Sequence, residues 1–154
     1  MLEIEERTEE GGLSVSETIR LEPNPKNKCF GCGGAADGGM LLTFDQDNLN
    51  RRIVGRFVMG ERYQGGGGML HGGIIAMLLD EAMGKVCRFR EARAVTADMT
   101  IDYLKPVRVD QEIVVEAFET AARGRNLFHM GEIRDAAGSV LARGRARFVI
   151  IGEK

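Results

Sequence analysis

One long apolar helix is predicted in this chain, and the other strongly patterned segments resemble β-strands. The helix spans about 72–90, which is roughly five turns. A glycine-rich loop precedes it, and residues 64–84, which contain the loop and the first part of the helix, read QGGGGMLHGGIIAMLLDEAMG. Strand patterns occupy about 40–44, 51–59, 94–104, 112–122, 127–134 and 140–151. Short turns join the later strands, which favours antiparallel neighbours. We therefore predict an α+β fold, with a curved antiparallel sheet of about six strands wrapped around one long central helix.

The segment 94–104 alternates with a period of two, so successive side chains face opposite sides of the sheet. Val95, Ala97 and Met99 belong to the apolar face, whereas Thr96 faces away from the core. The last strand alternates as well, and one of its faces is basic. We interpret that face either as a contact in a tetramer or as open surface; it consists of Arg143, Arg145 and Arg147.

The length fits one domain. A chain of 154 residues forms a single hydrophobic core without splitting into separate domains. We predict one domain over residues 1–154, with residues 1–22 as a short, partly ordered lead and residues 23–39 as a loop rich in Pro, Gly and Cys.

Charge and cysteine content restrict the class of protein. The 21 basic and 23 acidic residues are nearly balanced, so we expect no nucleic-acid and no membrane partner. The acidic first residues lack the basic start and apolar stretch of a secretory signal. Three cysteines are an odd number, which favours reduced thiols over disulfides. These features predict a soluble cytoplasmic protein.

Two adjacent carboxylates on the predicted helix differ in their surroundings. Glu81 lies four residues before Lys85, and a surface ion pair explains it. Asp80 shares its helix face with uncharged residues such as Met77 and Cys87. A carboxylate in such surroundings is unfavourable unless it has a partner or a chemical role. We therefore interpret Asp80 as the acid of an acyl-transfer or hydrolysis site.

These residues carry a resemblance to a known family. His71-Gly-Gly, six apolar residues and then Asp80 resemble the helix signature of hotdog-fold acyl-CoA thioesterases, in the branch related to the phenylacetate-pathway enzymes. The similarity extends through VTADMTIDYLKP of residues 95–106 and back to CFGCG of residues 29–33. The carboxylate nine positions after the histidine and the Lys-Pro strand end make the combination fairly specific for the hotdog fold.

The resemblance implies a catalytic centre on the helix. Asp80 corresponds to the family's catalytic carboxylate, which attacks the thioester carbonyl or activates a water molecule to do so. Gly72 or Gly73 would supply the backbone N–H that binds the carbonyl oxygen, because N–H groups at a helix start are free to stabilise negative charge.

Three further positions complete the catalytic set that the resemblance implies. Gln64 lies near the position of a polar side chain beside the thioester. Thr96 matches a position at which relatives place a hydroxyl that helps to hold the attacking water. His71 is expected to order the loop by hydrogen bonding, with acid–base catalysis as the alternative reading.

The spacing along the helix predicts a shared site. Gly73 and Asp80 are seven residues apart, so their backbones lie ~10 Å apart on a straight helix. Both groups must lie within ~3 Å of the reacting atoms, which one chain does not achieve. We expect an obligate homodimer with the glycine from one subunit and the acid from the other. The resemblance agrees, since it implies dimers or dimers of dimers, the latter a homotetramer.

Candidate substrate contacts come from two kinds of side chain. Flexible thioether side chains suit an adaptable acyl pocket, although their helical spacing is equally typical of a core. Those candidates are Met69, Met77, Met83 and Met99. Basic side chains at strand ends would meet coenzyme A phosphates, although such charges are often only solvated. Those candidates are Lys105, Arg123 and Arg125.

Cys29 and Cys32 supply half the ligands of a tetrahedral zinc site. No second pair of cysteines follows, and the chain has only two histidines. We therefore favour a packed loop near the pocket over a metal or redox site. No metal ion is expected, and no cofactor apart from coenzyme A as part of the substrate.

The predicted activity is hydrolysis of an acyl-CoA thioester to a free acid and coenzyme A. One alternative is a non-catalytic acyl-CoA-binding or sensing protein of the same fold. The other is a hotdog dehydratase or hydratase, which pairs a catalytic histidine with the acid at a different spacing. Asp80 argues against a pure binder, since binding alone needs no buried acid. The acyl group, and the choice between nucleophile and general base, stay open.

Overall fold

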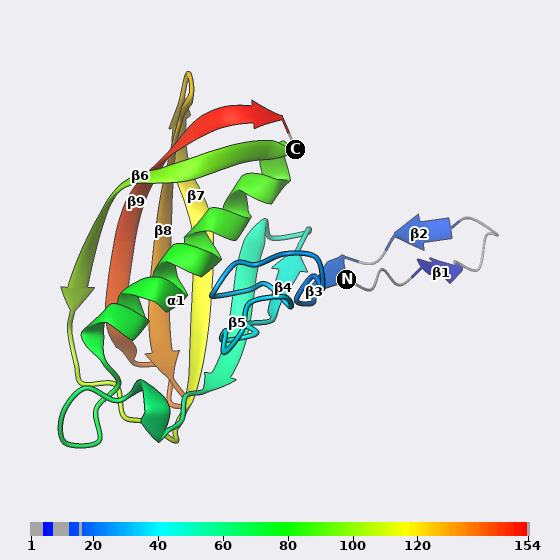
Figure 1. Ribbon diagram of the computed structural model, residues 1–154. Helices are drawn as coiled ribbons and strands as arrows, with labels where there is room; N and C mark the ends of the chain where they lie inside the picture. Colours follow the sequence, from blue (N-terminus) through cyan, green and yellow to red (C-terminus); the bar gives the residue numbers. More distant parts are fainter. Residues whose placement is uncertain (1–4, 8–12, 16, 154) are drawn as a thin grey trace.

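Helix α1, Gly72–Lys85, lies on the concave face of a curved antiparallel sheet (Figure 1). The computed structural model describes residues 5–7, 13–15 and 17–153. The 3-10 helix η2, Val86–Arg90, continues α1, and a second 3-10 helix, η1, spans Glu61–Tyr63. No helix within the described ranges is long and apolar enough to cross a bilayer. The predicted α+β arrangement of one long helix on a sheet is confirmed.

In the described part of the chain the main sheet has seven strands in the order β3-β4-β5-β7-β8-β9-β6, and each neighbouring pair is antiparallel. Two short strands at the N-terminus, β1 and β2, form a separate antiparallel pair. The strands are β1 Glu5–Arg7, β2 Leu13–Val15, β3 Thr18–Leu21, β4 Phe44–Asp47, β5 Arg52–Val58, β6 Ala92–Tyr103, β7 Glu112–Arg123, β8 Asn126–Asp135 and β9 Val140–Glu153.

The N-terminal part of the sheet differs from the prediction. Residues 18–21, assigned to a partly ordered lead, form β3 and pair with β4, which gives seven strands rather than about six. The strand predicted at 40–44 begins only at Phe44. The physical reason is that buried Phe44 and Gln46 alternate with half-buried Asp45 and Asp47, so the strand lies at 44–47 rather than at 40–44. The turn follows at Asp47, whose Oδ1 accepts a hydrogen bond of 3.0 Å from the Asn50 N–H.

A β-bulge in β6 changes the predicted alternation of this strand. Thr96 pairs with Phe148 of β9, the register then shifts, and Ala97 is the extra residue. The predicted pattern holds from Met99 onward, but it is reversed before the bulge. Val95 is 49% exposed rather than buried, and Thr96, although exposed, directs its hydroxyl toward α1. One inserted residue thus moves a hydroxyl onto the helix side of the sheet.

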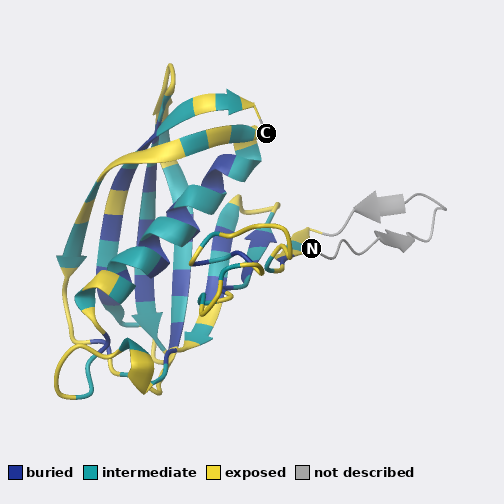
Figure 2. Cartoon of the chain, viewed as in Figure 1, coloured by how far each residue is buried: buried dark blue, intermediate teal, exposed yellow. Residues whose placement is uncertain are grey.

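Two glycines allow α1 to lie close to the sheet. Gly131 of β8 and Gly144 of β9 lie beneath the helix, where the strands are most deeply buried (Figure 2). A Cβ at Gly131 would be 3.1 Å from Leu79, and a Cβ at Gly144 would be 3.1 Å from Met83. Both helix side chains are fully buried. The close approach fixes the height of α1 above the sheet, because a packed interior has no free volume for a shift.

The outward face of β9 carries arginines with acidic partners on the neighbouring strands. Each guanidinium donates to a carboxylate of its own chain, so the charge of this face is balanced locally. The pairs are Arg143 with Glu132 at 3.1 Å, Arg145 with Asp102 at 2.9 Å and Arg147 with Asp98 at 2.9 Å.

A buried histidine connects α1 to β8. His129 is 1% exposed, and its Nδ1 donates to the Met83 carbonyl oxygen at 2.7 Å. Its Nε2 lies 3.5 Å from Glu119 Oε2 and has no hydrogen-bond partner among the described residues. Burial lowers the pKa of His129 below its ordinary value of 6.5, because it disfavours the charged ring. The folded protein therefore keeps this ring neutral.

We expect acidification to destabilise the protein through His129. Below about pH 6.5 the unfolded chain takes up a proton that the folded chain does not, so stability is lost as the pH falls from about 6.5 through the lowered folded-state pKa. The loss is at most about 1.4 kcal/mol per pH unit. Urea unfolding at several pH values measures it. His129→Gln should remove this dependence, and His71→Asn should retain it. Equal pH dependence in His129→Gln and the wild type would contradict the assignment.

Candidate active site

The start of α1 is capped by His71. Its Nδ1 accepts a 2.9 Å hydrogen bond from the Gly73 N–H, and its carbonyl oxygen accepts from Ile74 and Ile75. The predicted loop-ordering contact is therefore present. Gly72 and Gly73 were the two candidates for the N–H that binds the carbonyl oxygen. The Gly73 N–H already donates to His71, whereas the Gly72 N–H has no acceptor among the described residues.

The acid on α1 has a hydroxyl partner on β6. Thr96 Oγ1 donates to Asp80 Oδ1 at 2.7 Å. The expectation that Asp80 lacks a partner is thus corrected, and so is the placement of Thr96 on the far face of its strand. The bulge at Ala97 is the reason for both differences, since it turns Thr96 toward the helix.

A groove of about 930 Å³ opens beside Asp80. The second half of α1, the first residues of β6 and residues 21–27 contribute to its walls. Asp80 and Thr96 lie on it together with apolar Phe148 and Ile151. The groove also carries basic side chains that were not among the predicted site residues, Lys85, Arg88 and Arg93. The sequence predicted Lys85 only as the partner of Glu81 in a surface ion pair.

The predicted acyl-pocket methionines do not line this groove in the single chain. Met83 is 0% exposed and packs in the core against Gly144, and its contact with an acyl group stays a prediction. Met99 and Met77 are half-buried, and Met69 lies in the loop before α1. The apolar part of the groove comes from β6, β9 and the N-terminal segment instead.

The predicted phosphate-binding residues lie at opposite ends of β9. The Lys105 N–H donates to Leu141 O near the start of β9, whereas the Arg125 guanidinium donates to Ile150 O near its end. Nine residues of strand separate these positions by about 30 Å. Arg123 lies over the Phe128 ring in the same turn as Arg125. One chain therefore does not bring the three basic residues together.

Two further residues, Gln64 and Tyr103, belong to the surroundings of the start of α1. Gln64 is exposed, ends η1 and forms a bridge with Leu70. Tyr103 of β6, which was not among the predicted site residues, donates its hydroxyl to Gly72 O at 2.8 Å. Strand β6 thus contacts both ends of the site, Gly72 through Tyr103 and Asp80 through Thr96.

The loop before β4 brings two cysteines to Glu81. Cys29 Sγ donates to Glu81 Oε1 at 3.3 Å, and Lys85 Nζ lies 4.0 Å from Glu81 Oε2. The Glu81 and Lys85 side chains are both only 17% exposed, so this is not the surface ion pair that the sequence predicted. Burial raises the pKa of Cys32 to about 12. The proximity of Glu81 to the two cysteines could not be predicted from their spacing, because Glu81 lies 52 residues after Cys29 in the sequence.

The region from the glycine-rich loop to β9 matches a known protein family. The sequence profile of the thioesterase superfamily covers residues 67–148, more than half of the chain. The chain belongs to the thioesterase superfamily. The matched range contains α1, Asp80 and Thr96.

Curated acyl-coenzyme A thioesterases are similar to more than half of this chain. Acyl-coenzyme A thioesterase THEM4 of Rattus norvegicus is 40% identical over 82 residues, which are 53% of this chain and 35% of that protein. Acyl-coenzyme A thioesterase 13 of Homo sapiens is 31% identical over 98 residues, 61% of this chain and 69% of that protein. This chain therefore spans about a third of the length of rat THEM4.

Solved structures of the superfamily share the fold. Protein RHA08564 has a TM-score of 0.68 at 24% identity, over 72% of this chain and 56% of that chain. The PaaI protein of E. coli has a TM-score of 0.64 at 22% identity, over 68% and 75% of the two chains. Protein smu.793 of Streptococcus mutans, solved bound to acetyl CoA, has a TM-score of 0.65 at 17% identity, over 67% and 83%. The expected hotdog fold is confirmed.

Proposed function

We propose that this protein hydrolyses acyl-coenzyme A thioesters to a free acid and coenzyme A. Membership of the thioesterase superfamily and the two curated relatives, both named acyl-coenzyme A thioesterases, support the reaction class and the substrate class. The observation that carries the proposal is the hydrogen bond from Thr96 to Asp80 at the groove. It holds a carboxylate at a cavity wall, where a substrate carbonyl has room to approach.

Asp80 would act as nucleophile or general base. Thr96 binds Oδ1, and among the described residues Oδ2 accepts no hydrogen bond, so one oxygen is positioned while the other is available for the reaction. A thioester suits such an acid because its thiolate leaves without strong acid assistance. The Asp80 carboxylate would either attack the carbonyl carbon or remove a proton from the attacking water.

The Gly72 N–H would stabilise the oxyanion that forms on the thioester carbonyl. It lies at the positive end of α1 and is the glycine N–H that His71 leaves free. Gly72 and Asp80 are eight residues apart, about 12 Å along the helix. One chain therefore cannot present both groups to the same carbonyl.

A homodimer formed through β6 would bring the two groups together. β6 is the last strand in the sheet order and 12 residues long, and its outer edge has no partner within the described chain. Thr96 and Asp80 lie near one end of this strand, and Tyr103 and Gly72 lie at the other. Antiparallel pairing of two β6 strands about a two-fold axis places opposite ends side by side. Asp80 of one subunit would then face Gly72 of its partner.

The alternative activities find less support in the side chains. The alternative of a dehydratase or hydratase requires a catalytic histidine that acts together with the acid. His71 caps its own helix, and His129 is buried with its Nδ1 on Met83 O. A pure binding protein would not require the oriented Asp80–Thr96 pair. The three free cysteines agree with the reducing cytoplasm proposed as the site of the reaction.

Asp80→Asn should abolish hydrolysis while leaving the fold and the dimer intact. The amide keeps the shape of the side chain but neither attacks a carbonyl nor accepts a proton, so we expect a loss of kcat of at least about 100-fold. Thiol release from short, long and aromatic acyl-CoAs measures the rate. Asp98→Asn, on the outward face beside Arg147, serves as the control and should retain activity. Undiminished turnover by Asp80→Asn would remove Asp80 from the mechanism.

Thr96→Val should reduce kcat more than it changes KM. The substitution removes the hydroxyl that orients Asp80, and a hydrogen bond to a charged group contributes about 1.5–3 kcal/mol, or roughly a 10- to 100-fold change in rate. Thr96→Ser keeps the hydroxyl and should remain close to the wild type. Steady-state kinetics of both variants provides the comparison. Wild-type kcat in Thr96→Val would mean that the bond does not position the acid.

A further inference from the structure

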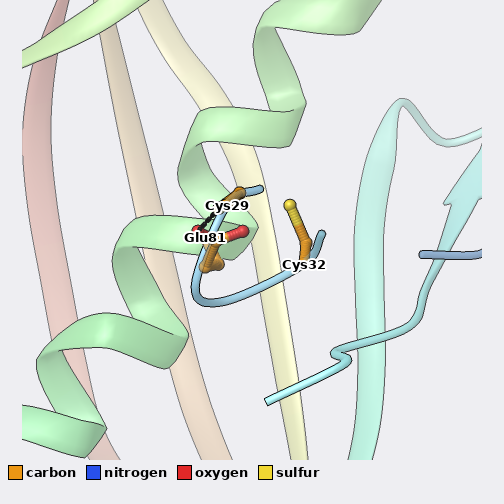
Figure 3. A group of neighbouring side chains, drawn as sticks. All are labelled: Cys29, Cys32 and Glu81. Atoms are coloured by element: carbon orange, nitrogen blue, oxygen red, sulfur yellow. Dashed lines mark hydrogen bonds between the residues drawn. The ribbon is translucent and has the colours of Figure 1, made fainter. Parts of the chain in front are cut away.

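Three potential metal ligands converge between the loop before β4 and helix α1. The Sγ atoms of Cys29 and Cys32 and a carboxylate oxygen of Glu81 all lie within 4.8 Å of one another. Glu81 extends from α1 toward the turn that carries both cysteines (Figure 3). The three side chains come from segments about 50 residues apart in the sequence and are each half-buried.

We propose that Cys29, Cys32 and Glu81 bind a divalent metal ion, with zinc as the ion that this donor set prefers. Two thiolates and a carboxylate are characteristic zinc ligands, and soft sulfur excludes magnesium and calcium. Ligand sulfurs of a tetrahedral zinc site lie about 3.8 Å apart. The cluster therefore needs to contract by about 1 Å at most. A water molecule from the adjoining groove, which Cys32 also lines, would fill the fourth position.

The loop is already shaped to present the two thiols. Asn27 Oδ1 accepts from the Cys29 N–H, and Cys29 O accepts from the Gly33 N–H, both at 2.9 Å. Gly31 lies between the cysteines and directly against the helix, since a Cβ there would be 2.6 Å from the Glu81 carboxylate. These contacts hold the turn around the carboxylate before any ion binds. The entropy cost of ordering the loop on metal binding is therefore small.

The charges around the cluster suit a divalent ion. Two thiolates, one carboxylate and one divalent cation sum to a single negative charge, and Lys85 beside Glu81 supplies the positive charge that balances it. Binding would release the two thiol protons to solvent. The ion would join the loop to α1 at the residue next to Asp80, and it would thus fix one wall of the groove without taking part in the hydrolysis.

Cobalt titration of the full-length protein tests the site. After reduction of the thiols and removal of metals by a chelator, Co²⁺ should bind at one ion per chain and produce thiolate-to-cobalt charge-transfer absorption. Binding of Co²⁺ to the metal-free protein should release protons and raise Tm, and equimolar Zn²⁺ should displace the Co²⁺ and abolish the absorption. Absence of this absorption in the reduced wild-type protein would overturn the proposal. So would a Cys29–Cys32 disulfide as the state isolated from cells.

Variants locate the ion. Cys29→Ser and Cys32→Ser should lose the charge-transfer band, and Glu81→Gln should weaken Co²⁺ binding at least about tenfold. Gly31→Ala keeps all three donors but displaces the carboxylate, so it should also weaken binding. Cys87→Ala, which removes the third cysteine, and Asp80→Asn should bind as the wild type does. Loss of the band in Cys87→Ala with retention in Cys29→Ser and Cys32→Ser would contradict the assignment.

Discussion

The close contact between α1 and the sheet determines where each group of the candidate site lies. Gly131 and Gly144 place no side chain of their own beneath α1, so the helix packs closely against β8 and β9 in one position. From that position Asp80 reaches Thr96 at 2.7 Å, and Gly72 O receives the Tyr103 hydroxyl at 2.8 Å. Both partners belong to β6. The edge strand therefore fixes the acid end and the helix start of the site at the same time.

The helix and the five later strands could be predicted because their signals are local. The apolar run after His71 and the alternating segments that follow need no knowledge of distant contacts. The helix-facing position of Thr96 could not be predicted, because a bulge depends on the pairing of β6 with β9, and the alternation of one strand does not reveal it. The same holds for Glu81, whose sulfur partner Cys29 is 52 residues away.

The proposal that the site is shared between subunits rests on the geometry of one chain. The acid and the free glycine N–H lie eight residues apart on one rigid helix, and a hydrolytic site needs both at one carbonyl. The carboxylate and the glycine N–H can be removed by separate substitutions. Asp80→Asn removes the acid, and Gly72→Pro removes the N–H at the first helical residue, where proline is well tolerated. His71 has φ −58° and ψ 134°, which suits a residue before proline.

Activity of mixed dimers tests the shared site most directly. The Asp80→Asn and Gly72→Pro chains should each be inactive alone, because every site lacks one group. In a mixed dimer one site has both defects and the other has none. Co-expressed chains carrying different tags should therefore recover about a quarter of the wild-type acyl-CoA hydrolysis, from random pairing. Mixed dimers that form but stay as inactive as the parent variants would contradict a site built from two subunits.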